Sequence, residues 1–154
     1  MNTYKAYKLR IYPNKEQKIM IDKTFGCTRF VFNKFLSERK EKYEENKIKL
    51  SAYEQLKELT NLKKEKKWIK EVDSCALQKC VFNLDDAFKN FFRGNGYPKF
   101  KAKGEHESYT TNNTLNEYKN VKYESIRIDF KNKVITLPKL KKVKSKIWRN
   151  HYLI

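Results

Sequence analysis

Few side chains in this sequence have the types and spacing that catalysis requires. Hydrolysis of nucleic acids usually needs clustered carboxylates that hold two metal ions, or a nucleophile beside a positioned base. Asp85 and Asp86 are adjacent on a predicted helix, so their carboxylates point about 100° apart. His106 and His151 have no companion ligand at a metal-binding spacing. The sequence therefore predicts no catalytic residue, no metal site and no cofactor in this chain.

The three cysteines fit a reducing compartment better than a disulfide framework. Their number is odd, and Cys75 and Cys80 lie on one predicted helix, about 140° apart around its axis. We interpret Cys27, Cys75 and Cys80 as buried thiols. The N-terminus lacks the apolar run and cleavage site of a signal peptide, and no apolar stretch approaches the ~18–20 residues of a membrane span. We expect a cytoplasmic, nucleoid-associated protein.

Positive charge is the strongest functional signal in the composition. The 154 residues hold 36 Lys and Arg against 18 Asp and Glu, a net charge of +18. Residues 1–15 carry four basic residues and no acid, and residues 130–154 carry eight basic residues and no acid. Aromatic residues make up 14% of the chain, which argues against a disordered polyelectrolyte. This pattern predicts a folded protein whose two chain ends face phosphate groups.

The elements that would position these residues alternate between strands and helices. Residues 4–12 alternate with period two and end at Pro13, as a strand does. A helix is predicted from Asn14, whose capping box is completed by Gln17, to a stop at Gly26, and a second helix from Thr28.

Two further helices and several strands follow. Ser51 with Glu54 predicts another capping box, and Asp73 predicts the cap of a helix that ends near Gly94. The apolar stripe of that last helix consists of Leu77, Val81, Leu84, Phe88 and Phe91. Residues 126–137 predict a hairpin with its turn at Asn132, and residues 143–147 a strand. Because a lone strand is unstable, the first strand should pair with the C-terminal strands, which makes the helices an insertion in an α+β fold.

Five strings, in this order, resemble the N-terminal half of the TnpB (OrfB) proteins of bacterial insertion sequences. They are residues 5–17, 26–36, 68–92, 96–101 and 137–140, and the match covers residues 1 to about 146. The resemblance implies the N-terminal part of an RNA-guided DNA endonuclease. It also implies an oligonucleotide-binding-like (wedge) β-barrel over residues 1–13 and 106–154, incomplete at the C-terminus. A helical recognition insertion, often described as a helix-turn-helix, would span residues 14–105.

Family members continue into a RuvC-like nuclease domain, whose three acids hold metal ions, and a Cys-rich zinc ribbon. This sequence stops at Ile154, before the first catalytic Asp motif of the family. The resemblance therefore implies a truncated copy or a fragment that is not itself an enzyme. Its implied partners are guide RNA, double-stranded DNA and a separate nuclease half.

The resemblance also assigns candidate site residues. Gln78, Ser74 and Tyr53 match, or neighbour, positions that read a short DNA element beside the target, and Thr114 does so after the motif Ser108-Tyr109-x-Thr111. The amide of Gln78 suits bidentate reading of adenine. Arg29 and Asn33 are either a structural polar pair or RNA contacts, and Trp68 and Trp148 are expected in the core. The predicted contacts to the nucleic-acid backbone are Lys5, Lys8, Arg10, Lys101, Lys103, Lys139, Lys141, Lys142 and Lys144.

Two other functions fit the same sequence. One is a guide-independent DNA-binding regulator with a helix-turn-helix-like module, and the other is an inert truncated remnant. A structured RNA that copurifies with the protein favours the guided module, whereas duplex binding without RNA favours the regulator.

Overall fold

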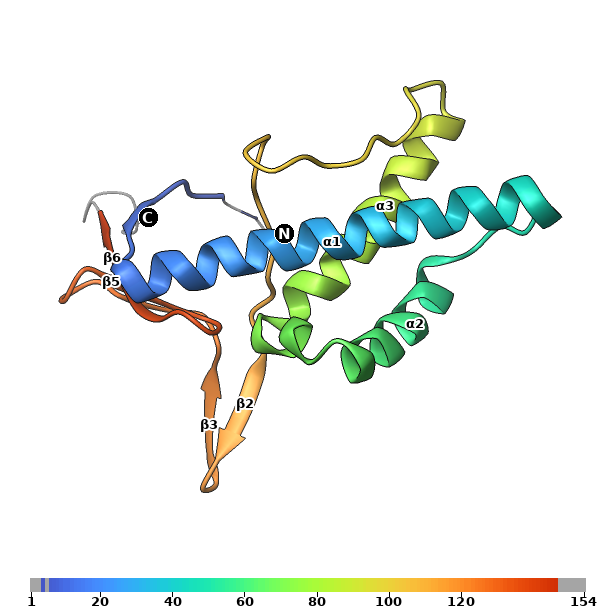
Figure 1. Cartoon of the computed structure of the whole chain (residues 1–154). Coiled ribbons are helices and arrows are strands. Elements are labelled where there is room, and N and C mark those ends of the chain that lie inside the picture. Colours follow the sequence, from blue (N-terminus) through green and yellow to red (C-terminus); the bar gives the residue numbers. More distant parts are fainter. Residues whose placement is uncertain (1–3, 5, 147–154) are drawn as a thin grey trace. The chain divides into compact units, whose positions relative to one another are not determined.

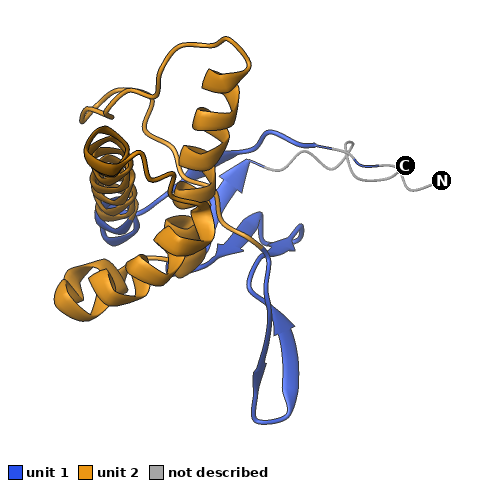
Figure 2. Ribbon diagram, turned by 90° about the vertical axis from the view of Figure 1, so that its right-hand side faces the viewer, with its two compact units in different colours: residues 1–20, 113–154 blue, residues 21–112 orange. Residues whose placement is uncertain are grey.

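The computed structural model describes residue 4 and residues 6–146, which form parts of two compact units (Figure 2). Unit 1 consists of residues 1–20 and 113–154, and unit 2 of residues 21–112. The predicted boundaries of the barrel and its insertion, at residues 13 and 106, stay a prediction. Lys5, a predicted phosphate contact, and Trp148, expected in the core, lie outside the described residues. Trp68, also expected in the core, is 40% exposed, so that prediction is wrong.

Unit 1 contains an antiparallel sheet of four strands in the order β1-β6-β5-β4. The strands are β1 (Arg10–Tyr12), β4 (Arg127–Asp129), β5 (Val134–Leu137) and β6 (Lys141–Lys146). The pairing of β1 with β6 confirms that the first strand joins the C-terminal strands. Of the strand predicted over residues 4–12, the structure has Arg10–Tyr12 as β1, and Arg10 pairs with Lys146 at the end of β6.

The hairpin of β4 and β5 turns where the sequence predicts. Asp129 accepts hydrogen bonds from the backbone N–H of Asn132 (3.0 Å) and from its side-chain amide (2.7 Å). These bonds and the nearby charge of Lys142 lower the pKa of the Asp129 carboxyl. Its charge is thereby retained well into the acidic range.

A second hairpin, β2 (Leu115–Tyr118) with β3 (Val121–Glu124), was not predicted. Its two turn residues, Lys119 and Asn120, both have positive φ angles, 50° and 62°. This conformation is that of a type I′ turn, for which Asn-Gly is the usual sequence signal. Because Lys-Asn lacks the glycine, the sequence offers no turn signal here.

The strands establish the α+β class but not the barrel. The two edge strands of the four-stranded sheet, β1 and β4, do not pair with each other among the described residues. The closed wedge barrel stays a prediction.

One helix, α1 (Lys15–Asn46), runs through Gly26, so the predicted stop there is wrong. A helix-interior glycine costs only about 0.5–1 kcal/mol relative to alanine. The buried stripe on both sides of it, which includes Thr24, Cys27 and Val31, outweighs that cost.

Unit 2 packs α2 (Ala52–Glu65), a short 3-10 helix η1 (Lys67–Glu71) and α3 (Ser74–Phe92) against α1 (Figure 1). Phe35 of α1, Leu59 of α2 and Leu77 of α3 are almost completely buried. Both predicted caps are confirmed: Ser51 forms a capping box with Glu54, and Asp73 accepts the backbone N–H of Cys75. The part of the chain that the structure describes has no helix long and apolar enough to cross a membrane.

The start of α1 is tied to the sheet of unit 1 through one side chain. Gln17 completes the predicted capping box with Asn14, through bonds of 2.9 and 2.8 Å. Its Nε2 also donates to the backbone carbonyls of Leu140 (3.0 Å) and Lys142 (2.8 Å). Gln17 therefore holds together the helix and the β5–β6 turn.

We expect Gln17→Ala to lower the free energy of unfolding by about 1–3 kcal/mol, since several hydrogen bonds worth about 0.5–1.5 kcal/mol each are lost. Gln17→Glu is the matched variant: it keeps the capping box but places acceptors against two carbonyls. Urea denaturation should show a lower free energy of unfolding for both variants than for the wild type. If Gln17→Glu is as stable as the wild type, the contacts to the turn do not contribute.

Candidate nucleic-acid interface

The register of the four-stranded sheet gathers basic residues on one of its faces. Residues directly opposite each other on paired strands point to the same side. Arg10 lies opposite Lys146, and Lys144 lies opposite both Tyr12 and Val134. The same alternation adds Lys142 and Arg127, which both lie opposite Thr136. We call this set the basic face: Arg10, Tyr12, Arg127, Lys142, Lys144 and Lys146.

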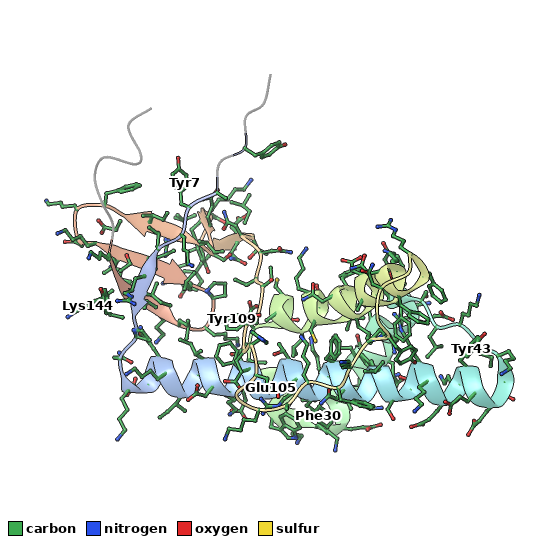
Figure 3. All side chains as sticks on the ribbon, turned by 90° about the horizontal axis from the view of Figure 1, so that it is seen from above. Tyr7, Phe30, Tyr43, Glu105, Tyr109 and Lys144 are labelled. Carbon is green, nitrogen blue, oxygen red and sulfur yellow. The ribbon has the colours of Figure 1, made fainter. Side chains whose placement is uncertain are left out.

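The other side of the same strands is mostly apolar, apart from the buried Ser145 and the exposed Lys141. Val143 is fully buried, and Ile11 and Ile135 are half-buried. Because this side is held in the interior, the alternation fixes the basic residues on the outside. Figure 3 shows Lys144 projecting from the sheet.

Electrostatics makes the basic face a site for anions. Arg10 and Lys146 carry like charges directly across two strands, which destabilises a sheet unless counter-ions compensate. Among the strand residues that share the face, the only acid is Asp129. Phosphate groups are the complementary ligands for a face with this excess of positive charge.

A groove in unit 1 extends the positive charge beyond the strands. It has a volume of about 680 Å³ and is lined by the start of α1 and by Arg127, Lys139, Lys141 and Lys142. Lys139 and Lys141 have φ angles of 64° and 58°, a left-handed conformation that is uncommon outside glycine. The exposed Lys8 precedes β1. The predicted contacts Lys8, Arg10, Lys139, Lys141, Lys142 and Lys144 thus all belong to unit 1.

The other two predicted backbone contacts lie on a loop of unit 2. Lys101 and Lys103 are exposed, and the ammonium of Lys101 lies 4.4 Å from the ring centroid of Phe32. The side chain of Asn33 accepts the backbone N–H of Lys101 (2.8 Å) and donates to its carbonyl (2.9 Å). Arg29 forms an ion pair of 2.9 Å with Glu107. Arg29 and Asn33 therefore anchor this loop, which favours the structural alternative over RNA contacts.

The α2–α3 face of unit 2 carries three of the predicted DNA-reading residues. Ser74 and Gln78 are one turn apart on α3 and exposed, and Ser74 accepts a hydrogen bond of 2.8 Å from Lys63 at the end of α2. Tyr53, 72% exposed at the start of α2, packs edge-on against Phe82, one turn beyond Gln78. The two helices therefore run antiparallel and present Ser74, Gln78 and Tyr53 along one side.

The pKa of the Lys63 amine is lowered because the side chain is partly withdrawn from water. Gln78 makes no side-chain hydrogen bond within the residues that the structure describes. Its amide is therefore available to a ligand.

Thr114 belongs to unit 1, at the base of the β2–β3 hairpin. Its backbone N–H donates to the hydroxyl of Ser125 (2.8 Å), and its carbonyl accepts the backbone N–H of Ser125 (2.9 Å). Thr114 is exposed beside these two hydrogen bonds.

The motif before Thr114 is structural. Tyr109 packs edge-on against Phe25 at 5.8 Å, and the hydroxyl of Thr111 donates to the carboxylate of Asp73. Asp73 thus caps α3 with one oxygen and fixes the following loop with the other. The sequence revealed the cap but not this second contact.

The candidate metal and thiol residues have structural partners. Asp85 pairs with Arg39 (3.1 Å) and Lys89 (3.0 Å). Burial raises the pKa of the Cys80 thiol to about 11, and its Sγ donates to the carbonyl of Thr28. Cys27 is buried too, but Cys75 is only half-buried, contrary to the prediction. No group of three His, Cys, Asp or Glu side chains that could hold a metal occurs among residues 4 and 6–146.

Three residues of the basic face were missed in the sequence: Tyr12, Arg127 and Lys146. For Lys146 a signal was available, since it continues the two-residue spacing of Lys142 and Lys144 around the apolar Val143.

A family model for the helix-turn-helix domain of the OrfB proteins of IS605 matches residues 1–48. Among those residues, the described part of the structure holds β1 and the uninterrupted α1, rather than two helices joined by a turn. The family description and the local structure therefore differ at this point.

Three curated proteins are similar to the chain. Virulence protein VsdF of Salmonella dublin is 37% identical over 108 residues, which cover 64% of this chain and 87% of that protein. A protein of Streptomyces pristinaespiralis named "Putative RNA-guided DNA endonuclease" is 36% identical over 102 residues, 64% of this chain and 25% of that protein. InsQ of Escherichia coli K12, also named "Putative RNA-guided DNA endonuclease", is 28% identical over 144 residues, 91% of this chain and 33% of that protein.

The chain therefore spans a quarter to a third of the two relatives named as endonucleases. The family model, these relatives and the five ordered strings agree. The chain belongs to the TnpB (OrfB) family of bacterial insertion sequences.

Proposed function

We propose that this chain is a nucleic-acid-binding module of a TnpB-like RNA-guided DNA endonuclease, and that it binds guide RNA and a short DNA motif beside the target. The observation that carries the proposal is the basic face, which places Arg10, Lys142 and Lys144 on the same side of one sheet, opposite a mostly apolar side. The relatives named as RNA-guided DNA endonucleases support it. The proposal assigns binding, and not cleavage, to these 154 residues.

Within this proposal the two units have different tasks. The basic face and the groove residues Lys139 and Lys141 hold phosphates of RNA or duplex, together with Lys8. Lys101 and Lys103 add phosphate contacts from unit 2. The DNA motif is read by Gln78, Ser74 and Tyr53 on the α2–α3 face and by Thr114 at the hairpin. The strands of unit 1 would then be part of a wedge barrel formed by residues 1–13 and 106–154.

Gln78→Ala tests the reading of bases. An amide that reads adenine supplies about 1–3 kcal/mol of discrimination, so the variant should lose the preference at one base pair. Its free energy of unfolding should change by less than about 0.5 kcal/mol, because Gln78 is exposed. Selection from a randomised duplex library measures the base preference. Lys141→Ala is the matched control, because it should weaken the binding of all duplex sequences alike. If Gln78→Ala keeps the base preference, Gln78 does not read DNA.

The identity of copurifying nucleic acid separates the guided module from the alternatives. A structured RNA that remains bound during purification supports a guided module. Sequence-specific duplex binding without any RNA would instead identify a guide-independent regulator, and the absence of both would identify an inert remnant.

A further inference from the structure

We propose that an aromatic pocket in unit 2 binds one unpaired base of RNA. The inference rests on the proposed function, since it requires that the chain binds RNA. The pocket has a volume of about 450 Å³, lies within the range of small-ligand sites and is mostly apolar. The residues that line it include Arg39, Tyr43, Lys49, Phe88, Phe92 and Tyr97.

A buried guanidinium with an unused donor lies against this pocket. Arg39 is only 7% exposed. Its Nε donates to Gln55 (2.7 Å), its Nη1 pairs with Asp85 (3.1 Å), and its Cζ lies 5.1 Å from the ring centroid of Phe88. Its Nη2 is buried and has no hydrogen-bond partner among the described residues. A buried donor without an acceptor is destabilising, and an acceptor in the pocket would reach Nη2 once the side chains that cover it shift.

The walls of the pocket suit a flat ring. Tyr97 packs edge-on against Phe88 (5.6 Å) and Phe91 (5.2 Å), and all three rings line the pocket. Phe92 is 71% exposed, and Tyr43 is 48% exposed near the end of α1 (Figure 3). Exposed aromatic rings are the usual platforms on which unpaired bases stack.

The positive charge of Lys49, which lines the pocket, favours a nucleotide as the ligand. Lys49 lies 5.9 Å from the ring centroid of Phe92, where its ammonium can meet a phosphate next to the bound base. A nucleobase offers both a ring face and a carbonyl acceptor for Arg39. An aromatic side chain of a partner protein would bring no phosphate to Lys49. Unpaired bases are a property of RNA loops and ends, whereas duplex DNA keeps its bases stacked and paired, so the structure points to RNA.

Binding of a 12-residue oligouridylate tests the pocket. The probe is compared with an abasic strand of equal length, which keeps the phosphates and lacks the bases, and with a 12-residue oligothymidylate DNA. Wild-type protein should bind the oligouridylate on the order of tenfold more tightly than the abasic strand. Phe92→Ala should weaken the binding of oligouridylate toward that of the abasic strand, and should leave the affinity for the abasic strand unchanged. The matched control is Phe100→Ala, which removes an exposed ring outside the pocket and should preserve the difference.

A second measurement does not depend on any substitution. Oligouridylate that carries 4-thiouridine should photo-crosslink to peptides containing Tyr43 or residues 88–97.

Two results of the affinity measurements would overturn the assignment of a base to the pocket. One is equal affinity of the wild type for oligouridylate and the abasic strand, and the other is a Phe92→Ala variant that prefers oligouridylate as strongly as the wild type does. In both cases binding of the abasic strand would still uphold the proposed function. Binding to neither strand would contradict the proposed function itself. If the protein binds the oligothymidylate DNA as tightly as the oligouridylate, and Phe92→Ala weakens both, then the pocket is not specific for RNA.

Discussion

The affinity of this chain for nucleic acid should fall by roughly 10³-fold or more when the salt concentration rises from 50 to 200 mM. Each phosphate that a basic residue neutralises releases bound counter-ions, and contact with six or more phosphates gives a fall of this size. The basic face, the groove lysines and Lys8 provide enough cations for such a contact. Fluorescence anisotropy with a labelled duplex and a labelled RNA, measured over this salt range, gives the slope.

Variants show which cations are responsible. Lys142→Ala with Lys144→Ala should make the slope of log affinity against log salt shallower by about two, since each phosphate contact contributes about one. The matched control is Lys57→Ala with Lys64→Ala, which removes two exposed lysines of α2 and should leave the slope nearly unchanged. Affinity that does not vary with salt, or equal effects of the two pairs, would contradict a phosphate-binding role for the basic face.

Phe35→Ala should lower the free energy of unfolding of unit 2 by about 3–5 kcal/mol. The ring of Phe35 is fully buried in the middle of the helical core, and its removal leaves a cavity between tightly packed elements. The backbone carbonyl of Phe35 also accepts the side chain of Gln55 (3.0 Å), so relaxation around the cavity would disturb that bond. Urea denaturation followed by far-UV circular dichroism measures the loss.

Phe100→Ala is the control for the Phe35 experiment. Phe100 is 57% exposed in the same unit, and its loss should change stability by less than about 0.5 kcal/mol. If Phe35→Ala lowers the free energy of unfolding no more than Phe100→Ala does, then the helices do not pack around Phe35.

Local signals predicted most of the helical structure. The caps at Ser51 and Asp73 and the stripe of α3 depend on hydrogen bonds and spacings within a few residues, so the sequence reveals them directly. The break at Gly26 was wrong because tertiary burial overrides a weak local preference. The β2–β3 hairpin was missed because its turn, Lys119-Asn120, has no glycine.

The site was predictable only in part, because it depends on which segments meet. The acid-free chain ends correctly indicated a positive surface, and the pairing of β1 with β6 brings Arg10 and Lys146 together. That Arg29 and Asn33 hold a loop, and that Arg39 lies under a pocket, follows from contacts between residues far apart in sequence. No pattern within one segment carries that information.

The cross-strand pair of Arg10 and Lys146 gives dissolved salt two opposing effects on this protein. Ions screen the repulsion between like charges and so stabilise the free sheet, while the same ions compete with phosphates for it. A bound polyanion relieves the repulsion and also raises the free energy of unfolding by mass action, by about 2.7 kcal/mol at 100 times its Kd. If the chain binds nucleic acid as proposed, its thermal stability will depend on the concentration of that ligand as well as on its own core.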